Sequence, residues 1–305
     1  MVNDISKFNA PSYALKESIN IGLVQTTINN SEAWKKDAKF PRISPSQDVH
    51  VWNEICKAMR EFVDSDKKPH IILFPELSIP VTRLDDFEKL VAELNVIAIA
   101  GVDYQVNNSK RIVKNEGIVF VPQGFWRRNS SRYCTRIIFG KAHPAPLENS
   151  MLTNASPPWS FRGDHNVYLF DLNEYGNAGI SICYDFMDIE RALMYRGKIH
   201  HLFVLAYNKD VGMFHSLAES LSRTIYCNVV VCNTGFYGGS IAVSPFYDSF
   251  RRKLFSHEGG NLFTTQVFTL PLKYLDDSLS GIPKKSTVKE SEKLLFKDPP
   301  PGIEK

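Results

Sequence analysis

Three apolar segments of the sequence each end in a side chain that can take part in covalent chemistry. IILFPE ends in Glu76, RIIFGK ends in Lys141 and GISIC ends in Cys183. A thiol needs a base to become a useful nucleophile, and a carboxylate can act as that base when burial raises its pKa. An ammonium group nearby favours the thiolate and stabilises an oxyanion. Together, the three residues would form a set for acyl transfer.

Each of these residues also has a purely structural interpretation. A cysteine at a strand end is commonly a small buried hydrophobic residue. A glutamate after proline is commonly a charge at a helix N-terminus, and a lysine that closes a strand is commonly an exposed charge. The choice between the interpretations depends on the elements that position the three side chains.

Apolar strand patterns alternate with helical patterns along the chain, which indicates an α/β fold. The first part predicts strands at 20–26, 70–76 and 96–101, and helices at 49–63 and 84–94. A later part repeats this order, with strands at 178–183, 200–208 and 229–235 and helices at 187–197 and 212–227. Strand ends are where α/β folds place their sites, and all three candidate residues lie at such ends.

Other segments predict antiparallel strands, loops and a tail. We expect a hairpin from 117–124 and 134–141, and further strands at 166–172, 240–246, 251–256 and 262–272. The two halves resemble each other in style, which suggests two packed sheets with helices outside. Segment 144–159 holds too many Pro, Asn and Ser residues for regular structure. We predict a domain at 1–275 and a C-terminal arm or linker at 276–305, where Lys, Ser and Pro are frequent.

Composition limits the classes of protein that the chain can represent. The 305 residues are 43% hydrophobic, enough for a large core, and 36 basic against 33 acidic residues leave a net charge of +3. This small charge gives no reason to propose nucleic acid as a partner. No apolar run approaches the roughly 18 residues of a membrane helix. The five cysteines are odd in number and scattered, so we expect reduced thiols and a cytoplasmic location. No pair has CxxC spacing, so we expect no bound metal.

The motifs FPE, GK and CYD occur in the order and approximate spacing of the nitrilase superfamily of carbon–nitrogen hydrolases, and the sequence resembles this family from INIGLVQ to about residue 270. Glu76 stands in FPE, which resembles the general-base motif of the family. Lys141 opens KAHPAPLE, similar to its lysine motif, and Cys183 stands in GISICYD, similar to its nucleophile motif. Glu148 falls where many members have a second glutamate.

The resemblance implies a four-layer α-β-β-α sandwich and a hydrolase that needs no cofactor. Glu76 would take the proton of Cys183, whose sulfur attacks a carbonyl or nitrile carbon to form a thioester. Lys141 and the main-chain N–H of Tyr184 would stabilise the oxyanion, and Glu148 would hold Lys141 or the water. The resemblance also implies a homodimer or higher oligomer that forms across helices 187–197 and 212–227.

The departures from the family pattern fall in segments that contact substrate. LSIPV follows Glu76, FMDIER follows CYD, and LAYNKDVG replaces another common stretch. Within the last segment, Tyr207 and Asn208 are expected to border the pocket. His143, between Lys141 and Glu148, is a further candidate for the pocket, with a loop histidine as the structural alternative.

Three functions remain open at the level of the sequence. The first is hydrolysis of a small-molecule amide, favoured over a nitrile because CYD stands where nitrilases of the family carry a CWE-type motif. The second uses the same acyl-enzyme for acyl or ammonia transfer. The third is a binding or assembly domain of a larger regulatory protein, which the intact Glu76, Lys141, Glu148 and Cys183 argue against.

Overall fold

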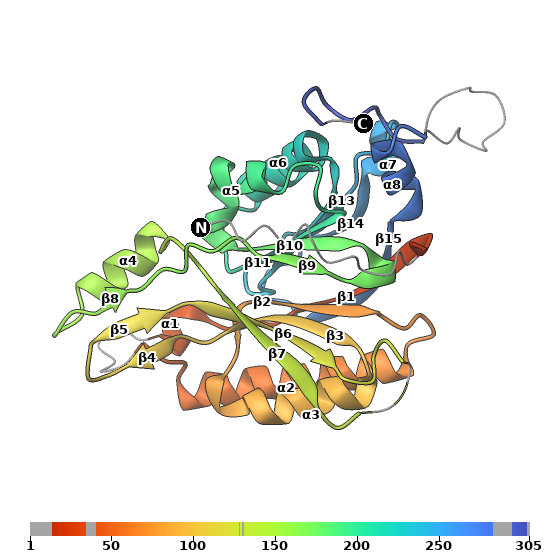
Figure 1. The fold of residues 1–305 in the computed structure, drawn as a ribbon. Coiled ribbons are helices and arrows are strands. Elements are labelled where there is room, and N and C mark those ends of the chain that lie inside the picture. Colours follow the sequence, from red (N-terminus) through yellow and green to blue (C-terminus); the bar gives the residue numbers. More distant parts are fainter. Residues whose placement is uncertain (1–13, 35–40, 128, 130, 283–294, 304–305) are drawn as a thin grey trace.

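Two six-stranded sheets lie face to face, with helices on their outer faces (Figure 1). This arrangement comes from a computed structural model that describes residues 14–34, 41–127, 129, 131–282 and 295–303. The predicted α/β fold and its four-layer α-β-β-α order are confirmed.

The first sheet has the strand order β15-β1-β2-β3-β6-β7. Its strands are β1 (Ser18–Gln25), β2 (Ile71–Ile79), β3 (Ile97–Val102), β6 (Glu116–Pro122), β7 (Cys134–Gly140) and β15 (Thr264–Pro271). Strands β1, β2 and β3 run parallel, as their crossover helices require, and β6 and β7 form the predicted hairpin. Helices α2 (Pro45–Asp64) and α3 (Leu84–Leu94) cover the outer face (Figure 1).

The second sheet has the strand order β14-β13-β12-β11-β10-β9. Its strands are β9 (Leu169–Asp171), β10 (Asn177–Ile182), β11 (His201–Ala206), β12 (Asn228–Asn233), β13 (Ser240–Val243) and β14 (Lys253–His257). Strands β10, β11 and β12 run parallel, and α5 (Ile189–Met194) and α6 (Val211–Leu221) cover the outer face. Strand β15 then crosses back and pairs with β1 in the first sheet.

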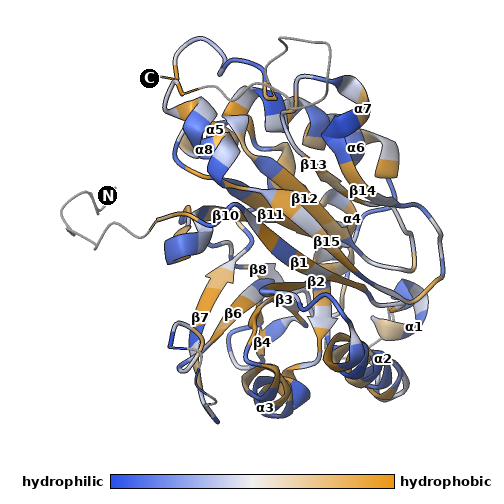
Figure 2. Ribbon diagram, turned by 90° about the vertical axis from the view of Figure 1, so that its right-hand side faces the viewer, coloured by the Kyte–Doolittle hydropathy of each residue, from blue (hydrophilic) through white to orange (hydrophobic). Residues whose placement is uncertain are grey.

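The strands of the sandwich centre are buried on both faces, which explains their continuous apolar runs. In β2, Ile71 and Leu73 join the core between the sheets, whereas Ile72 and Phe74 pack under the helices. This division follows from the alternation of side chains along a strand. Figure 2 shows the result: the hydrophobic strands lie in the interior, and the helices that cover them are hydrophilic on their outer faces.

Several short elements decorate the sandwich. A small sheet of β4 (Gln105–Asn107), β5 (Ile112–Lys114) and β8 (Ser160–Phe161) gathers with α4 (Pro146–Thr153) at one end of the molecule (Figure 1). The others are α1 (Asn30–Ala33), α7 (Ser249–Arg252) and α8 (Lys273–Leu279). None of the described helices is long and apolar enough to cross a membrane.

The structure corrects three local predictions. Segment 144–159 was expected to be irregular, but it contains α4, because Pro146 occupies the first turn, where its missing N–H costs nothing. The strand expected at 166–172 is only the three residues of β9. The helix expected at 212–227 ends as an α-helix at Leu221 and continues as a π-helical turn, Ser222–Tyr226.

The predicted boundary between domain and arm at residue 275 stays a prediction, and positions 283–294, 304 and 305 of the arm lie outside the described residues. Among the described ones, α8 contributes the buried Leu275 and Ser278. Phe296 is 2% exposed and stacks on Phe246. These parts of the C-terminal segment therefore pack against the second half of the sandwich.

Candidate active site

A bulge in β2 places Glu76 at the end of the first sheet. The pairing of β2 with β3 breaks after Phe74 and resumes at Ile79, and Leu77 has a positive φ of 57°. On β3, Gly101 lies so close that a Cβ there would sit 2.4 Å from the Glu76 Cα. Glycine is therefore required opposite the bulge, and the bulge turns the Glu76 side chain toward the end of the sandwich.

The Glu76 carboxylate is 2% exposed and has a hydrogen-bond donor at each oxygen. Its Oε1 accepts from Lys141 Nζ at 2.8 Å and from Asn115 Nδ2 at 2.9 Å. Its Oε2 accepts from the main-chain N–H of Tyr207 at 3.1 Å. These donors offset the cost of burying a carboxylate, so the side chain is held in one orientation.

Lys141 follows β7 directly and lies between two carboxylates. Its Nζ donates to Glu76 Oε1 and, at 2.7 Å, to Glu148 Oε2. Burial acts to lower the pKa of the Lys141 ammonium, but the charges of Glu76 and Glu148 outweigh it and raise the pKa well above its ordinary value. Lys141 is therefore a permanent cation, and it has three N–H groups of which the carboxylates occupy two.

Glu148 lies in the first turn of α4 and joins that helix to the cluster. Its Oε2 also accepts the main-chain N–H of Ala145 at 3.0 Å, which satisfies one free donor of the helix start. Burial acts to raise the pKa of Glu148, but the Lys141 ammonium and the bonds from Asn115 and Ala145 bring it below its ordinary value. Glu148 is thus an anion that fixes Lys141 from the side opposite Glu76.

Asn115 and Tyr104 belong to the same cluster, and the sequence did not reveal either. The Asn115 Nδ2 donates to Glu76 Oε1 and Glu148 Oε1, each at 2.9 Å, so one amide joins both carboxylates. The main-chain carbonyl oxygen of Asn115 accepts from the main-chain N–H of Lys141 at 2.9 Å. Tyr104 is 3% exposed, and burial followed by the charge of Glu148 raises the pKa of its hydroxyl. The only local signal was a polar Asn115 between two strand patterns.

Cys183 lies on a strained turn at the end of β10. It opens a 3-10 helix, Cys183–Met187, and has a φ of 45°, which non-glycine residues rarely adopt. The thiol is nearly buried, and burial followed by the Glu76 charge raises its pKa well above the ordinary value, against the charge of Lys141 and the N–H of Tyr207. At neutral pH the resting group is therefore a thiol beside a carboxylate.

Asp185 ties the nucleophile turn to the segment that follows Lys141. Its Oδ2 accepts from Ala142 N at 2.6 Å and its Oδ1 from His143 N at 3.0 Å. Burial raises the pKa of Asp185, and these two bonds act in the opposite direction. In the sequence, Asp185 stood out only as the last letter of CYD. The structure gives it a part in holding the ends of β7 and β10 together.

Two of the expected substrate-binding residues have exposed side chains. Tyr184 is 37% exposed on the 3-10 turn next to Cys183. The side chain of His143 is half-exposed, with its Nε2 3.8 Å from Asp188 Oδ2 and its ring 5.5 Å from the ring of His165. Both side chains are therefore open to solvent, and their contact with a substrate stays a prediction.

The other two expected residues follow β11 and act in different ways. Tyr207 reaches Glu76 through its main-chain N–H, while its hydroxyl donates to Ile28 O at 2.6 Å. The main-chain N–H of Asn208 donates to Asn233 Oδ1 at 2.9 Å, and its main-chain oxygen accepts from Asn233 Nδ2 at 2.7 Å. Its side-chain oxygen accepts from Asp210 N at 2.8 Å, so this side chain supports the turn into α6.

A hollow of about 260 Å³ lies next to the cluster, but neither the Cys183 thiol nor the Glu76 carboxylate lines it. Asn115 and Lys141 form part of its wall with Arg162 and Asp164, whereas Cys183 and Glu76 do not. Among the described residues, no group of three or more His, Cys, Asp or Glu side chains is arranged to hold a metal ion.

Comparison with solved structures shows which known fold this arrangement matches. An amidase from Nesterenkonia sp. is 13% identical, with a TM-score of 0.57, over 87% of this chain and 95% of that one. Saccharomyces cerevisiae Nit3, a member of branch 10 of the nitrilase superfamily, is 17% identical, with a TM-score of 0.58, over 90% and 98%. The chain has the nitrilase-superfamily fold.

A third structure with this fold is XC1258 from Xanthomonas campestris, a CN-hydrolase superfamily protein with an arsenic adduct in its active site. It is 11% identical, with a TM-score of 0.58, over 87% of this chain and 95% of that chain. Comparison with protein-family models and with curated protein sequences found no match. The nitrilase-superfamily fold therefore persists here at identities where the sequences have diverged almost completely.

Proposed function

We propose that the chain hydrolyses a small-molecule amide through a thioester on Cys183. The observation that carries this proposal is the position of the Glu76 carboxylate, which contacts the Lys141 ammonium and lies beside a thiol on a strained turn. A base, a cation and a nucleophile then meet at one point, which is the arrangement that acyl transfer requires.

In the first half of the reaction, the Cys183 sulfur attacks the amide carbonyl carbon while Glu76 takes the thiol proton. A C–S bond forms and the carbonyl oxygen becomes an oxyanion. The third N–H of Lys141, which the two carboxylates leave free, and the main-chain N–H of Tyr184 stabilise that oxyanion. Glu148 and Asn115 keep Lys141 and Glu76 in place.

In the second half, Glu76 gives its proton to the leaving nitrogen, the C–N bond breaks and the amine departs. Water then attacks the thioester carbon and Glu76 takes a proton from it. The C–S bond breaks, the carboxylic acid leaves and the Cys183 sulfur regains its proton. The same carboxylate therefore acts as base and acid in turn, without a net change of charge at the site.

Amides are the substrate class that structural neighbours support. One structure of the Nesterenkonia amidase shows the acetamide moiety of fluoroacetamide added to its active-site cysteine, and another holds acrylamide. These observations belong to that enzyme, and at 12% identity they suggest a first set of compounds for this chain. Transfer of the acyl group or of ammonia by the same thioester is the second candidate, and it is supported by the same cluster.

The decisive test is the rate at which iodoacetamide alkylates each cysteine across pH, followed by peptide mass spectrometry. Cys134 is the internal control, because it is more exposed than Cys183 and its pKa is about 12, raised by burial and the Glu88 charge. We expect Cys183 to react faster than Cys134 at pH 7. Glu76→Gln should slow it there, because the base is lost.

At high pH the slower alkylation of Cys183 in Glu76→Gln, relative to the wild type, should disappear or reverse. The Glu76 charge raises the thiol pKa, so Glu76→Gln makes the thiolate easier to form and its alkylation at pH 10 should be equal or faster. Cys183 labelling no faster than Cys134, and indifferent to Glu76→Gln at every pH, would show a core thiol and favour the binding or assembly role. Ammonia release, compared with transfer to hydroxylamine, then separates hydrolysis from transfer.

A further inference from the structure

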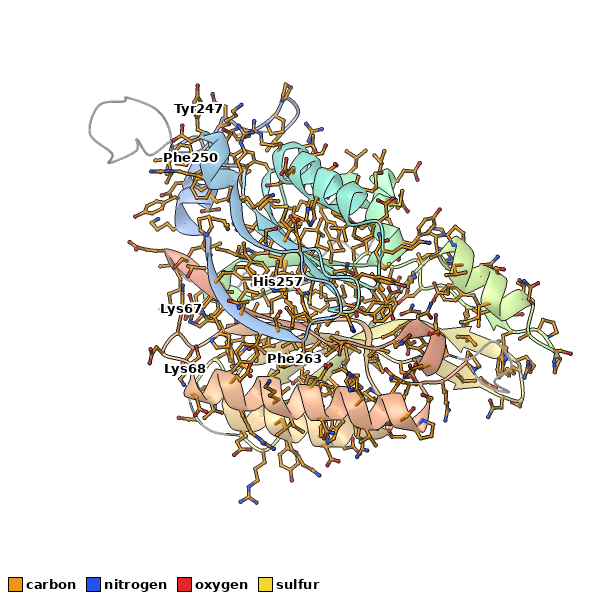
Figure 3. All side chains as sticks on the ribbon, turned by 180° about the vertical axis from the view of Figure 1, so that it is seen from behind. Lys67, Lys68, Tyr247, Phe250, His257 and Phe263 are labelled. Atoms are coloured by element: carbon orange, nitrogen blue, oxygen red, sulfur yellow. The ribbon has the colours of Figure 1, made fainter. Side chains whose placement is uncertain are left out.

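A second polar hollow, of about 350 Å³, lies on the outer side of the second sheet. It is bounded by the end of α6, the π-helical turn that follows, the end of β13 and α7. Figure 1 shows these elements together beside the C-terminal segment. Figure 3 labels Tyr247 and Phe250 at the same corner, away from Lys67, Lys68 and Phe263 on the other half of the molecule. The volume is within the range of small-ligand sites, about 300–1,000 Å³.

Two arginines line this hollow, and neither pairs with a described carboxylate within 4 Å. Arg252 donates from Nε to Phe246 O and from Nη2 to Tyr247 O, each at 3.1 Å. Arg223 donates from Nη1 to Pro245 O at 3.4 Å. Since a guanidinium carries five N–H groups, both retain donors for another molecule.

The two cations also oppose each other. Burial, and then the charge of Arg252, lowers the pKa of Arg223. Two like charges at a partly buried position are unfavourable unless an anion lies between them. An oxyanion in the hollow would remove this repulsion and satisfy the remaining donors.

Ser244 supplies an independent sign of a missing partner. It is 1% exposed, it lines the hollow, and its Oγ has no hydrogen-bond partner among the described residues. Its main-chain N–H donates to Arg252 O at 2.9 Å, so the hydroxyl and the arginine are held beside each other. Buried hydroxyls are nearly always satisfied, so an unpaired one on a residue that lines this hollow beside two arginines marks a ligand position.

The π-helical turn places Arg223 at this hollow. π-Helical turns are rare in proteins, and those that do occur often lie at functional sites. This one, Ser222–Tyr226, ends at a residue with a φ of 68°, and the Tyr226 hydroxyl is fixed by Ser278 Oγ at 2.8 Å. Backbone strain of this kind persists only where the surrounding structure stabilises it, so the position of Arg223 on this turn is fixed by its surroundings.

From this geometry we infer that the hollow binds the phosphate group of a small molecule. Arg223 and Arg252 would bind its oxygens, and the Ser244 hydroxyl would donate to one of them, as guanidinium and hydroxyl groups do in phosphate sites. Glu219 also lines the hollow and opposes an anion there, so it weakens the binding. The site does not use Cys183 or Glu76 and does not depend on the proposed amide hydrolysis.

The test is titration calorimetry of the full chain with inorganic phosphate, and separately with acetate, at constant ionic strength. Arg223→Gln removes a charged donor, and Arg251→Gln is the matched control because Arg251 lies on α7 outside the hollow and faces the Phe250 ring. Arg252 is left unchanged, because it supports two main-chain carbonyls. We expect phosphate binding that weakens about 10- to 100-fold in Arg223→Gln and stays unchanged in Arg251→Gln.

Two further variants should change the affinity for phosphate in opposite directions. Ser244→Ala should weaken phosphate binding, and Glu219→Gln should strengthen it, because the opposing charge is lost. Acetate should bind more weakly than phosphate, since it has fewer oxygens and less charge. Absence of phosphate binding to the wild-type chain, or an equal loss in Arg223→Gln and Arg251→Gln, would overturn the inference. A preference for acetate would overturn the assignment to phosphate.

Discussion

At the scale of single residues, the cluster is governed by its charge count. Two carboxylates and one ammonium give Glu76, Glu148 and Lys141 a net charge of −1, so ionisation of Cys183 would add a second negative charge to a buried site. This explains why the thiol pKa is raised although a cation lies beside it. Passing the proton to Glu76 during attack keeps the total charge constant, which favours a general-base mechanism over a preformed thiolate.

Asn115 gives the first prediction at this scale. Its amide is shared by Glu76 and Glu148, so Asn115→Ala leaves both carboxylates short of a donor inside the protein. We expect the free energy of unfolding in urea to fall by about 1–3 kcal/mol and amide turnover to fall with it. Asn149→Ala is the control, because Asn149 is exposed on α4. Equal effects of the two substitutions would contradict the bridging role.

At the scale of elements, the bulge of β2 and the glycine opposite it form one unit. Gly101→Ala would place a methyl group 2.4 Å from the Glu76 Cα and 2.5 Å from Pro75 O, both main-chain atoms that cannot easily move. We expect a loss of about 1–3 kcal/mol in the free energy of unfolding, measured in urea. The bulge should shift as well, so Cys183 alkylation at pH 7 should slow as it does in Glu76→Gln.

Gly212→Ala is the matched control for this change. Gly212 lies in α6, and a Cβ there would meet no atom within 4 Å. Alanine should therefore stabilise the protein by about 0.4–1 kcal/mol through the entropy of the unfolded chain. The prediction fails if the two alanine variants change stability in the same direction.

Asp103 connects a second pair of elements and gives a pH-dependent prediction. It follows β3 and accepts hydrogen bonds from Trp34 Nε1 after α1 and from Ile43 N before α2, each at 2.9 Å. Burial raises the pKa of Asp103 to about 6, against the bonds from Ile43 and Trp34. Trp34 in turn packs against Tyr104 and Tyr207 beside the cluster.

The folded pKa of Asp103 lies above the unfolded value of about 3.9, so the unfolded chain loses this proton first as pH rises. The contribution of Asp103 to the free energy of unfolding is therefore most favourable below pH 4 and falls by up to about 3 kcal/mol between pH 4 and pH 6. Asp103→Asn cannot titrate. In urea unfolding, the wild-type stability minus that of the variant should fall by this amount from pH 4 to pH 7.

The control for this titration is Asp66→Asn, at an exposed position after α2. It removes a carboxylate from the surface, so its stability difference from the wild type serves as the reference over the same pH range. A difference for Asp103→Asn that changes with pH no more than this reference would contradict the prediction.

At the scale of the whole molecule, the cluster exists only because the two sheets are stacked. Glu76 and Lys141 come from the first sheet, and Cys183 and Tyr207 come from the second. The bond from Tyr207 N to Glu76 Oε2 crosses between them. Any change that separates the sheets should therefore abolish the site.

The oligomer that the sequence resemblance implies stays a prediction, and the outer surface beside α5 is where we would test it. Ile189, Leu193 and Met194 are 68, 55 and 53% exposed, an apolar group on a helix that α6 adjoins. We expect light scattering to show a dimer for the wild type and a monomer for Leu193→Glu. Val63→Glu, at an equally exposed apolar position on α2, should remain dimeric. A monomeric wild type at micromolar concentration would contradict this prediction.

The sequence by itself determined the central strands and placed Lys141 and Cys183 directly after two of them, because alternation and apolar runs are local properties of the chain. The strand end expected at Glu76 was wrong, since β2 continues through a bulge to Ile79. The sequence did not reveal α4, since Pro, Asn and Ser disfavour helices on average. The start signal was nevertheless present, with Pro146 in the first turn and Glu148 two residues later. Packing of the buried Leu152 and the bond from Lys141 to Glu148 stabilise this short helix.

Only the tertiary structure decided which side chains share the cluster. Asn115 lies 39 residues from Glu76 and 33 from Glu148 along the chain. Asp185 lies 43 and 42 residues from Ala142 and His143, whose main-chain N–H groups donate hydrogen bonds to it. No periodicity links positions so far apart, because their contacts arise when strand ends from two sheets meet. The same holds for the hollow between Arg223 and Arg252, where the pairing of β13 with β14 and the π-helical turn bring two distant cations to one place.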